Sequence, residues 1–538
     1  MTHKRITDRN FTRYGLNMNP VVSLVSGLFI LFFSVYALFR LDQVNELFTA
    51  LNNYITIHFD WVFILSSTFF VIICIGLAVS KLGDVRIGGL DSEPEFTNFA
   101  WYSMLISAGM GIGLMFWAVG EPLTHFMVEP PIFTSGDGAF TALAATFLHW
   151  GLHPWGIYAL MALGLSYFAF NKKLPLSLRS VFYPFLGDKI YGVPGDLIDT
   201  FAVLATMFGL ATSLGLGTMQ INSGLNYIFG IQESVVVQVS IVAGVTFLAV
   251  ISVLAGIKKG VRFLSEMNMR LAFVFVTLIF LLGPTAYILR LFINATGLYF
   301  SNIVEYAMFL SIGGDAAAWQ GNWTIFYLAW WISWSPFVGM FIARISKGRT
   351  IREFIVGVLI VPTLLSFFWL SVFGGTAIHL DERAGGTLFE TVQDNYPVAL
   401  FEMVELLNMP FLTVLLRMGL FIVVTALVMA YFITSSDSGS LVVDKLTSGG
   451  IISSPRHQRA FWAIMEGLVA ATLLIIGGEK ALEALQTAVI TAGLPLAVIL
   501  VLMCFALIKG ISHTHAYQQR KERKRKICTI LSELEDDD

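Results

Sequence analysis

The sequence predicts an all-α integral membrane protein with twelve transmembrane helices, and three observations support this fold class. Of the 538 residues, 56% are hydrophobic and 13% are charged, whereas soluble proteins average about 25% charged residues. Apolar stretches of the roughly 20 residues that cross a bilayer recur along the chain. Lys and Arg alternate from one side of these stretches to the other. The twelve stretches lie near residues 20–39, 61–80, 98–118, 138–169, 197–229, 234–255, 268–290, 322–343, 353–378, 410–436, 460–477 and 484–508.

The distribution of positive charge predicts which side of the membrane each loop faces. The N-terminal segment, every second loop and the C-terminal tail together hold 28 of the 33 Lys and Arg residues. The loops of the opposite side hold Arg40, Arg290, Arg383 and Lys480. Cytoplasmic loops carry an excess of Lys and Arg, so both termini are expected in the cytoplasm. Arg417 falls inside the tenth span, where we expect it to snorkel outward or to pair with an acidic group.

Three segments outside the spans have a distinct composition. Gly256–Arg270 mixes basic and apolar residues, which predicts an amphipathic helix on the cytoplasmic face, with an ordinary basic loop as the alternative. Residues 381–409 are acidic and predict a small external cap, which would supply a partner for Arg417. The tail contains the basic block Arg520–Lys526, which suits anionic lipid headgroups; the alternative is a solvated topological anchor.

Sequence motifs of enzymes and of metal-stabilised folds are missing. The three cysteines are too few and too scattered for a disulfide or zinc framework. Gly-x-Ser-x-Gly, a phosphate-binding loop and His-Glu-x-x-His do not occur, so we expect no enzymatic activity, no organic cofactor and no nucleic-acid partner. A channel would need a continuous polar-lined pore, which is not evident. His149 and His153 have the spacing of a metal-binding pair but no third ligand, so hydrogen-bonded histidines are the favoured interpretation.

The most informative stretch is residues 106–122, which begins as an apolar span but contains Gly109, Gly111 and Gly113 within five residues. Each Gly costs about 1 kcal/mol relative to Ala inside a helix, so the helix is expected to break here. An unwound backbone at membrane depth is tolerated when it is buried in protein or lines a water-filled cavity, and transporters bind substrates at such breaks. The alternative is close packing of helices at small residues.

Aromatic and hydroxyl side chains gather in three other spans. The fourth span contains Trp150, Trp155 and Tyr158, with Pro154 expected to bend the helix, and the eighth span contains Trp331 and Trp334. Several aromatic faces together bind quaternary ammonium groups; the alternative is core packing. Late in the tenth span, residues 434–436 are Thr-Ser-Ser, which suits a small hard cation such as Na⁺. Hydrogen bonds from these hydroxyls back to helix carbonyls are the alternative.

Several motifs together resemble the betaine–choline–carnitine transporter family, over residues 20–508. They are Ala108-Gly-Met-Gly-Ile-Gly-Leu-Met-Phe, Glu121-Pro-Leu-Thr, His153-Pro-Trp, Trp330-Trp-Ile-Ser-Trp-Ser-Pro-Phe-Val-Gly-Met-Phe, Phe373-Gly-Gly-Thr-Ala and Ile433-Thr-Ser. The resemblance implies a leucine-transporter-type core in which five helices (98–290, with the amphipathic connecting helix) are repeated in inverted orientation (291–508). Two peripheral helices (20–97) precede the core, a cytoplasmic segment (1–19) precedes these, and a cytoplasmic tail (509–538) follows. A homotrimer in the bacterial inner membrane is also implied.

The resemblance further implies a set of substrate-binding residues. The trimethylammonium group would lie in a cage of Trp150, Trp155, Tyr158 and Trp331. Trp334 and Phe116 would line the path or its gates. The unwound backbone at Gly109, Met110, Gly111 and Gly113 would meet the substrate carboxylate.

Two sodium sites are also implied. One would use Ser107 and Met110 with Tyr431, Thr434 and Ser435; family members often carry Ala and Phe in place of Ser107 and Tyr431, where backbone oxygens serve. The second would use Thr206 and Phe337, but its usual second hydroxyl is replaced here by Leu210.

These residues predict a secondary active transporter that imports a betaine-type zwitterion by Na⁺ symport with alternating access. The alternative is a choline or carnitine carrier that works by proton coupling or exchange. Gly113 decides between them, because family members that carry choline tend to have Asp there. A carboxylate would attract the cation choline but repel a zwitterion, which brings its own carboxylate to that place.

Overall fold

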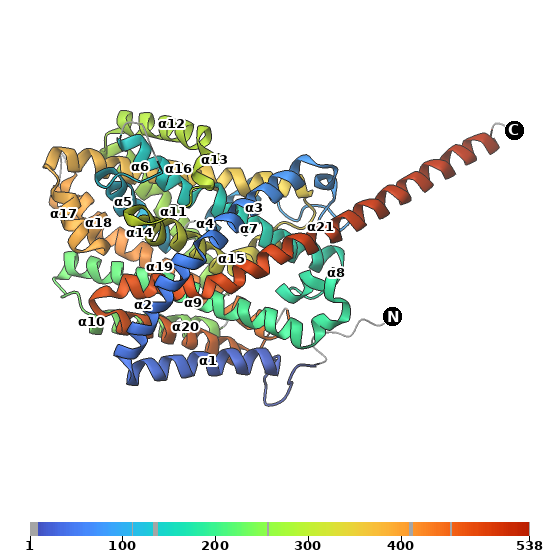
Figure 1. Ribbon diagram of the computed structural model, residues 1–538, viewed down its shortest axis with the longest axis horizontal. Helices are drawn as coiled ribbons and strands as arrows, with labels where there is room; N and C mark the ends of the chain where they lie inside the picture. Colours follow the sequence, from blue (N-terminus) through green and yellow to red (C-terminus); the bar gives the residue numbers. More distant parts are fainter. Residues whose placement is uncertain are drawn as a thin grey trace.

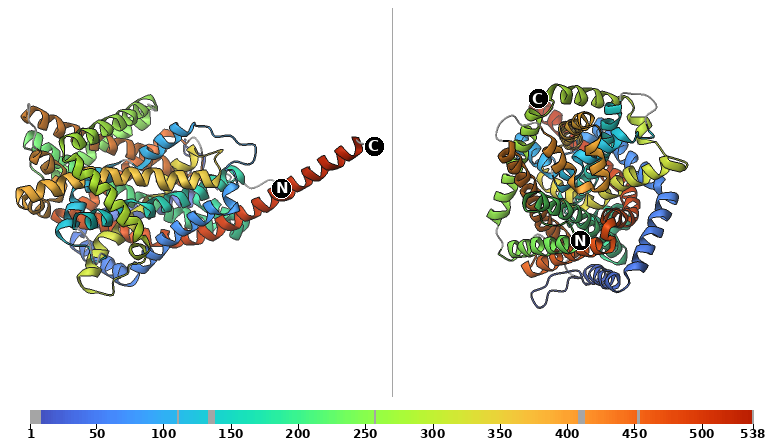
Figure 2. Two further views of the ribbon diagram at one scale, coloured as in Figure 1. Left: turned by 90° about the horizontal axis from the view of Figure 1, so that it is seen from above. Right: turned by 90° about the vertical axis from the view of Figure 1, so that its left-hand side faces the viewer.

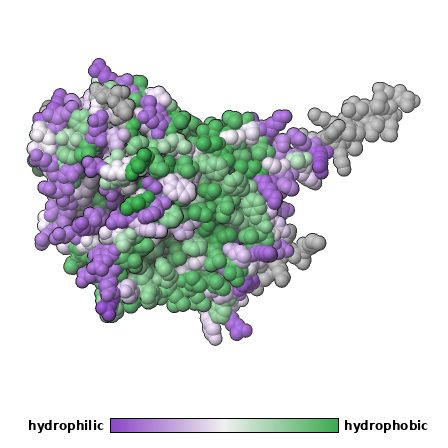
Figure 3. All heavy atoms as spheres, in the orientation of Figure 1, coloured by the Kyte–Doolittle hydropathy of each residue, from purple (hydrophilic) through white to green (hydrophobic). Residues whose placement is uncertain are grey.

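The computed structural model of the chain describes residues 9–109, 111–132, 138–255, 258–407, 413–451 and 454–536. Within these residues every regular secondary-structure element is a helix, and β-structure is limited to two isolated bridges. Hydrophobic side chains form a broad belt between two hydrophilic ends of the molecule (Figure 3). This arrangement fits helices whose outer faces contact lipid, and the all-α prediction is confirmed.

Nine helical stretches of the described residues are long and apolar enough to cross a membrane, or ten if the bent pair α4–α5 is one span. Their bounds are Pro20–Phe39 (α1), Asp60–Val79 (α3), Val193–Phe229 (α9), Val235–Ala255 (α10), Leu264–Leu282 (in α11), Gly314–Ile345 (α14 to α15), Ile351–Ala384 (α16), Val414–Thr447 (in α19) and Arg456–Arg520 (α20 into α21). The shorter helices are α2 (Leu41–His58), α8 (Tyr183–Leu186), α12 (Thr285–Ser301), α13 (Ile303–Ala307), α17 (Thr387–Asp394) and α18 (Ala399–Leu406).

When the bent pair α4–α5 is counted as one span, the difference between ten and twelve arises at two places. Helices α6 (Gly138–Trp150) and α7 (Leu152–Ser166), which cover the fourth predicted span, are each too short to be counted. The stretch Arg456–Arg520 is counted once, although a turn at Gly478, with φ of +55°, separates α20 (Arg456–Gly477) from α21 (Ala481–Asp536). Twelve spans and the inverted repeat therefore stay predictions.

The glycine-rich stretch breaks its helix, as predicted. Helix α4 (Asn98–Gly109) ends inside the glycine run, α5 (Ile112–Met127) begins three residues later, and the two axes differ by 63°. Gly111 lies between them with an extended backbone. Of the predicted site residues, Met110 lies outside the described part of the chain.

The fourth predicted span also contains a break, which the sequence interpretation placed wrongly. We expected Pro154 to bend this helix, but the helix is interrupted at Gly151, between α6 and α7. Pro154 lies in the first turn of α7, where a backbone N–H has no intrahelical partner to lose. A Cβ at Gly151 would lie 2.5 Å from the Phe147 carbonyl oxygen and 2.9 Å from the Phe367 ring, so close packing on both sides requires Gly at the break.

The predicted amphipathic helix at Gly256–Arg270 is not a separate element. Helix α11 runs without interruption from Lys258 to Leu282, so the basic segment and the seventh span form one helix. That helix ends at Leu282 and not near 290, because Gly283 and Pro284 follow. The residues Thr285–Ser301 form α12, which packs across α6 and α16 and lies along the top of the molecule in Figure 1.

The interior of the molecule is built from helices with little or no lipid-facing surface. All 15 residues of α7 are buried, and α15 (Phe326–Ile345) packs on α7, α9 and α21. Helix α19 (Thr413–Thr447) packs along α9. A helix that is apolar around its whole circumference belongs inside a bundle, and the two broken helices, α4–α5 and α6–α7, meet α15 there.

The two ends of the molecule differ. At one end the acidic segment forms α17, a short turn at Tyr396–Val398 and α18, and so caps the bundle (Figure 1). The start of α1 and the extended C-terminal part of α21 lie at the other end, as two of the views show (Figures 1 and 2). A cap was therefore predicted correctly within the described residues of 381–409.

Candidate functional site

A narrow cavity of about 30 Å³ lies where the break between α4 and α5 faces α6, α7 and α15. It is lined by Ala108, Gly109, Gly111, Gly113, Leu114, Trp150, Pro154, Trp155, Tyr158, Trp330, Trp331, Trp334 and Ser366. The structure thus brings together all four residues of the predicted cage, with Trp334 and the three glycines.

The cage rings contact one another edge to face. The ring centroids of Trp150 and Trp331 are 4.9 Å apart, those of Trp155 and Tyr158 are 5.5 Å apart, and those of Tyr158 and Trp331 are 6.2 Å apart. In each pair the ring planes are inclined by 68° to 83°. Such T-shaped pairs are the favoured arrangement of aromatic rings, and all four residues line the same cavity.

The glycines serve both purposes that the sequence left open. A Cβ at Gly109 would lie 2.5 Å from the Trp155 ring, and one at Gly113 would lie 2.8 Å from the Trp330 ring, so both positions allow close packing. A Cβ at Gly111 would meet no atom within 4 Å, so the backbone there is open.

Five further residues of the cavity wall were not among the predicted site residues, and Phe116 has a different place. The five are Ala108, Leu114, Pro154, Trp330 and Ser366. Trp330 stacks on Trp331 with centroids 4.7 Å apart, and Ser366 contributes from α16. The motif around Trp330 was visible in the sequence, but its spacing does not say which of two adjacent Trp residues faces a cavity. Phe116 lies outside this lining, where it stacks on Tyr396 of the cap at 5.5 Å.

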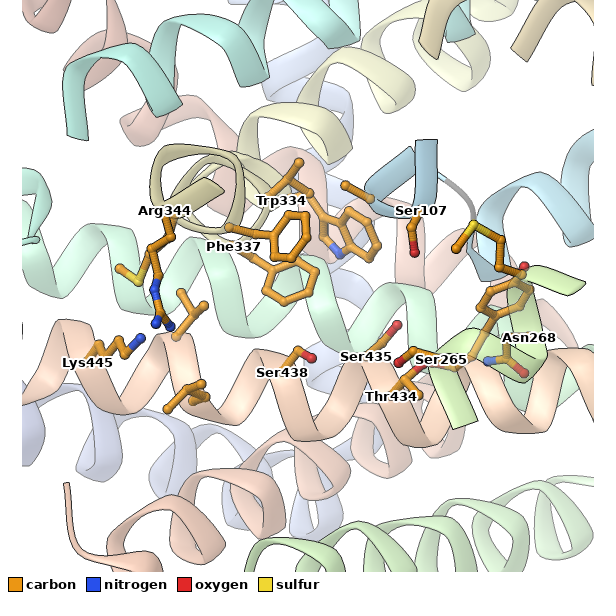
Figure 4. Close-up of a pocket in the computed structure, with 18 residues that line it drawn as sticks. Ser107, Ser265, Asn268, Trp334, Phe337, Arg344, Thr434, Ser435, Ser438 and Lys445 are labelled. Atoms are coloured by element: carbon orange, nitrogen blue, oxygen red, sulfur yellow. Dashed lines mark hydrogen bonds between the residues drawn. The ribbon is translucent and has the colours of Figure 1, made fainter. Parts of the chain in front are cut away.

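A second cavity, of about 240 Å³, lies between α4, α11, α15 and α19. Ser107, Phe337, Tyr431, Thr434 and Ser435 all line it, and Ala108 and Trp334 line both cavities. Figure 4 shows the hydroxyl groups of Ser107 and Ser435 directed into this space from α4 and α19. The described residues of the first predicted sodium site therefore converge.

The hydroxyls of this cavity differ in how they are bonded. Thr434 Oγ1 donates to the carbonyl oxygens of Ala430 (2.9 Å) and Tyr431 (3.2 Å), which is the alternative interpretation drawn from the sequence. It keeps lone pairs for a cation. Asn268 of α11 also lines the cavity and is 2% exposed, and neither its side-chain oxygen nor its nitrogen has a hydrogen-bond partner among the described residues. The sequence analysis missed Asn268; an amide inside a predicted amphipathic segment carried no signal.

The residues of the second predicted sodium site are not brought into one cavity. Phe337 lines the second cavity, but Thr206 lines neither cavity and donates its hydroxyl to the Ala202 carbonyl at 2.6 Å. Leu210 packs closely on α19 at Gly439. A Cβ added to Gly439 would lie only 2.6 Å from the Leu210 Cδ1 atom.

A group that could hold a metal ion lies behind the cage, at Glu121, His125 and His149. One ligand atom from each lies within 4.8 Å of the others, and all three residues are buried. His149 is hydrogen-bonded to Glu121 and Thr324, as the favoured interpretation of the histidine pair required, whereas His153 Nδ1 has no hydrogen-bond partner in the described residues.

Comparison with known proteins assigns the family. The family model for "BCCT, betaine/carnitine/choline family transporter" matches residues 21–516. A glycine betaine transporter of Vibrio parahaemolyticus is 45% identical over 508 residues, which cover 93% of this chain and 95% of that protein. A glycine betaine/proline/choline/ectoine transporter of the same organism is 43% identical, over 95% of this chain and 90% of that protein. A glycine betaine transporter of Acinetobacter baylyi is 43% identical, over 92% of this chain and 74% of that protein.

A match over nearly the whole chain agrees with the aromatic cavity at the broken helix and with the apolar belt. The protein is therefore a multi-pass membrane transporter of the betaine/carnitine/choline family, and not an enzyme.

Proposed function

We propose that the protein imports a betaine-type zwitterion, with glycine betaine as the preferred substrate, by Na⁺ symport. The observation that carries this proposal is the convergence of Trp150, Trp155, Tyr158 and Trp331 on one enclosed space beside an unwound backbone. Aromatic faces attract a quaternary ammonium group by about 0.5–2 kcal/mol each, more as water is excluded. All four side chains are at most 6% exposed.

The carboxylate of the substrate has a matching place at the start of α5. The first N–H groups of a helix lack intrahelical partners, and the helix dipole makes this end positive. Gly111 precedes α5, lines the cavity and has open space where a side chain would be. Among the described residues no Asp or Glu lines either cavity, so no negative side chain repels the substrate carboxylate.

The second cavity supports Na⁺ as the coupling ion. Ser107, Tyr431, Thr434 and Ser435 offer hydroxyl oxygens around it, and Na⁺ prefers oxygen ligands. The end of α4 forms part of the wall of both cavities through Ala108. A cation that orders the end of α4 therefore also shapes the cage. The packing of Leu210 on Gly439 gives no support to a second sodium site.

The two cavities also support alternating access. A buried water needs about 10–15 Å³, so the aromatic cavity holds about two waters and must widen to admit a betaine. The second cavity extends along α19 to Arg344 and Lys445 (Figure 4), two of the basic residues that predict the cytoplasmic side. We therefore propose that this arrangement is inward-facing.

The alternative, a choline or carnitine carrier with proton coupling or exchange, is less well supported. One of the relatives is named as a transporter of choline as well as glycine betaine. Choline lacks a carboxylate, however, so it would leave the N–H groups at the start of α5 without an anionic partner. Glycine betaine is therefore the preferred substrate in this proposal.

The surroundings of the transporter complete the proposal. The start of α1 and the C-terminal part of α21 lie at the same end of the molecule (Figure 1). We propose that this end faces the cytoplasm across a bacterial inner membrane, because the terminal segments and every second loop carry most of the Lys and Arg residues. The chain is further proposed to form a homotrimer. Its basic tail is proposed to contact anionic lipid headgroups.

The test is counterflow into proteoliposomes loaded with glycine betaine, choline, proline or ectoine, each with and without a Na⁺ gradient. We expect saturable uptake of glycine betaine that requires Na⁺ and that choline inhibits weakly. Uptake that does not saturate would favour a channel. A preference for choline, or full uptake without Na⁺, would contradict the proposal.

A further inference from the structure

The carboxylate of Glu121 lies directly behind one wall of the cage. Glu121 is fully buried, and its Oε2 accepts hydrogen bonds from Trp150 Nε1 at 2.8 Å and from the Tyr327 hydroxyl at 2.5 Å. Its Oε1 is 2.6 Å from His149 Nδ1. One side chain of α5 thus joins a cage residue of α6 to the first turn of α15.

The same network reaches a second ring of the cage. Trp331 Nε1 donates to the His149 carbonyl oxygen at 2.8 Å, and His149 Nε2 is 3.0 Å from Thr324 Oγ1. The indole nitrogens of Trp150 and Trp331 are therefore both held on the side of the rings away from the cavity. Both rings line the cavity, and Trp331 also stacks on Trp330 and Tyr327.

Hydrogen bonding, and not metal binding, accounts for this cluster. Oε2 of Glu121 accepts from two donors, Oε1 is paired with His149 Nδ1, and both ring nitrogens of His149 have partners. A metal ion would have to displace these bonds. Two fixed donors at Oε2, with a third at Oε1 in the His149 tautomer that carries its proton on Nδ1, suit the acceptor-only ionised form of the side chain.

We propose that Glu121 is a positioning residue that makes the cage selective for positive charge, although it does not touch the substrate. This inference rests on the proposed function. A carboxylate that accepts the indole N–H places negative charge at the ring edge and increases the electron density of the ring faces. Both effects strengthen the attraction of the Trp150 face for a cation, and water does not screen them at a fully buried site.

The cage therefore recognises charge as well as shape. Its inner surface is aromatic and uncharged, so it fits a trimethylammonium group and a tert-butyl group equally well. The negative charge of the protein that distinguishes these two groups is not on the surface of the cage but on the side chain behind Trp150. Glu121 supplies that charge through Trp150, while the start of α5 is left free for the substrate carboxylate.

The experiment compares glycine betaine with its carbon isostere, tert-butylacetate, which has the same shape and carboxylate but no positive charge. Dissociation constants for both are measured by calorimetry on the full-length protein in saturating Na⁺. In Glu121→Gln the charge is removed and the side-chain volume is kept. We expect the affinity for glycine betaine to fall about tenfold and that for tert-butylacetate to stay within about twofold, which reduces the selectivity ratio.

A matched control and a second variant accompany this measurement. His125 lies in the same buried cluster, one helical turn from Glu121, and makes no hydrogen bond to the cage in the described residues. His125→Ala should leave the selectivity ratio unchanged. Should Glu121→Gln fail to insert, Glu121→Asp retains the charge but withdraws it from Trp150, and a smaller fall in the same ratio is expected.

The outcomes separate this inference from the proposed function. If Glu121→Gln weakens both ligands equally, or leaves the ratio within twofold of the unsubstituted protein, the carboxylate is only structural and the inference is wrong. If the unsubstituted protein does not bind glycine betaine, the proposed function itself fails, independently of Glu121.

Discussion

Gly113 is the position where the absence of a side chain matters most for substrate choice. The sequence predicts that Asp at this position would favour choline if the larger side chain fitted. In the structure the larger side chain does not fit, because a Cβ at position 113 would lie 2.8 Å from the Trp330 ring and 3.1 Å from the Trp150 ring. Two buried indoles would have to shift, and such overpacking costs about 1–3 kcal/mol.

Gly113→Asp should therefore lower glycine betaine uptake about tenfold or more without a gain of choline uptake. Gly113→Ala should also lower uptake, because the clash begins at Cβ. Gly111→Ala, which keeps the N–H and meets no atom within 4 Å, should cause a smaller loss. Initial rates in proteoliposomes measure all three. Choline uptake by Gly113→Asp alone would show that the indoles move aside.

The hydroxyls of the second cavity yield a test of Na⁺ coupling. Changing both Thr434 and Ser435 to Ala should raise the Na⁺ concentration for half-maximal uptake about tenfold or more, because two oxygen ligands are lost. Thr206→Ala should have little effect, since its hydroxyl bonds to its own helix and lines neither cavity. Uptake is measured over a series of Na⁺ concentrations. Full transport by the double variant in Na⁺-free buffer would contradict the site.

The candidate site could be predicted largely from residue type, and the missed residues show where this approach ends. Trp150, Trp155, Tyr158 and Trp331 are large aromatic residues at membrane depth, a pattern visible without coordinates. Glu121 entered the sequence analysis only as part of a family motif, because it falls just beyond the predicted span 98–118, and its partner Tyr327 is 206 residues away. No local spacing predicts such a pair.

Among the helices, the breaks and ends follow local chemistry, whereas the packing partners do not. The glycine run predicted the break between α4 and α5 correctly. The break at Gly151 was missed, because a single Gly beside Pro154 gives two candidates and only the contact with Phe367 requires the glycine. The extent of α11 was misjudged because basic residues suggested a surface helix, although Lys and Arg are equally compatible with the end of a long helix.

The prediction that Arg417 pairs with the acidic segment is confirmed, since its Nη1 lies 2.6 Å from Glu405 Oε1. This pair joins α19 to the cap. The two side chains are 24% and 41% exposed, so solvent screens the pair and its contribution is at most about 1 kcal/mol. Arg417→Gln should therefore lower the unfolding temperature only slightly and leave uptake intact, with Glu405→Gln as the matched variant. Loss of transport in a folded, inserted Arg417→Gln protein would contradict this assignment.

A buried ion-pair cluster joins the turn at Leu178–Phe182 to the start of α9. Arg179 Nε is 2.5 Å from Asp199 Oδ2, and its Nη1 is 2.8 Å from Asp196 Oδ1. Burial by itself lowers the pKa of the Arg179 guanidinium, but Asp199 and Asp196 outweigh this and raise the pKa above its usual value. A raised pKa contributes stability that is complete below the unfolded-state pKa and is lost only above it, so the cluster persists through the physiological range.

Arg179→Gln should destabilise the protein by about 3–5 kcal/mol, because Asp199 would remain buried without its cation, whereas Asp196 would keep Arg9 at 3.3 Å. Arg179→Lys should recover only part of this loss, since an ammonium group cannot reach both carboxylates with the geometry of the guanidinium. Thermal unfolding in detergent at several pH values measures the effect. A loss of less than about 1 kcal/mol for Arg179→Gln would mean that water replaces the guanidinium.

For the molecule as a whole, the C-terminal part of α21 is the most protruding feature. The first part of α21 packs on α9, α15 and α20, whereas its C-terminal part leaves the body of the protein and extends away from it (Figure 1). Deleting residues 512–538 should flatten the dependence of uptake on osmolality without lowering its maximum, because ionic strength screens contacts between a basic block and anionic lipid. Uptake into liposomes with and without anionic lipid measures this. An unchanged osmolality profile would make the tail a topological anchor.

The wall shared by the two cavities has a thermodynamic consequence. Ala108 and Trp334 belong to both linings, so a ligand in one space and an ion in the other act on the same atoms. Binding at two such sites is reciprocal: whatever factor the ion adds to the affinity for the solute, the solute adds to the affinity for the ion. Under the proposed Na⁺ symport, a rise in the external Na⁺ concentration would therefore tighten binding of the solute, and the bound solute would in turn retain the ion until both are released.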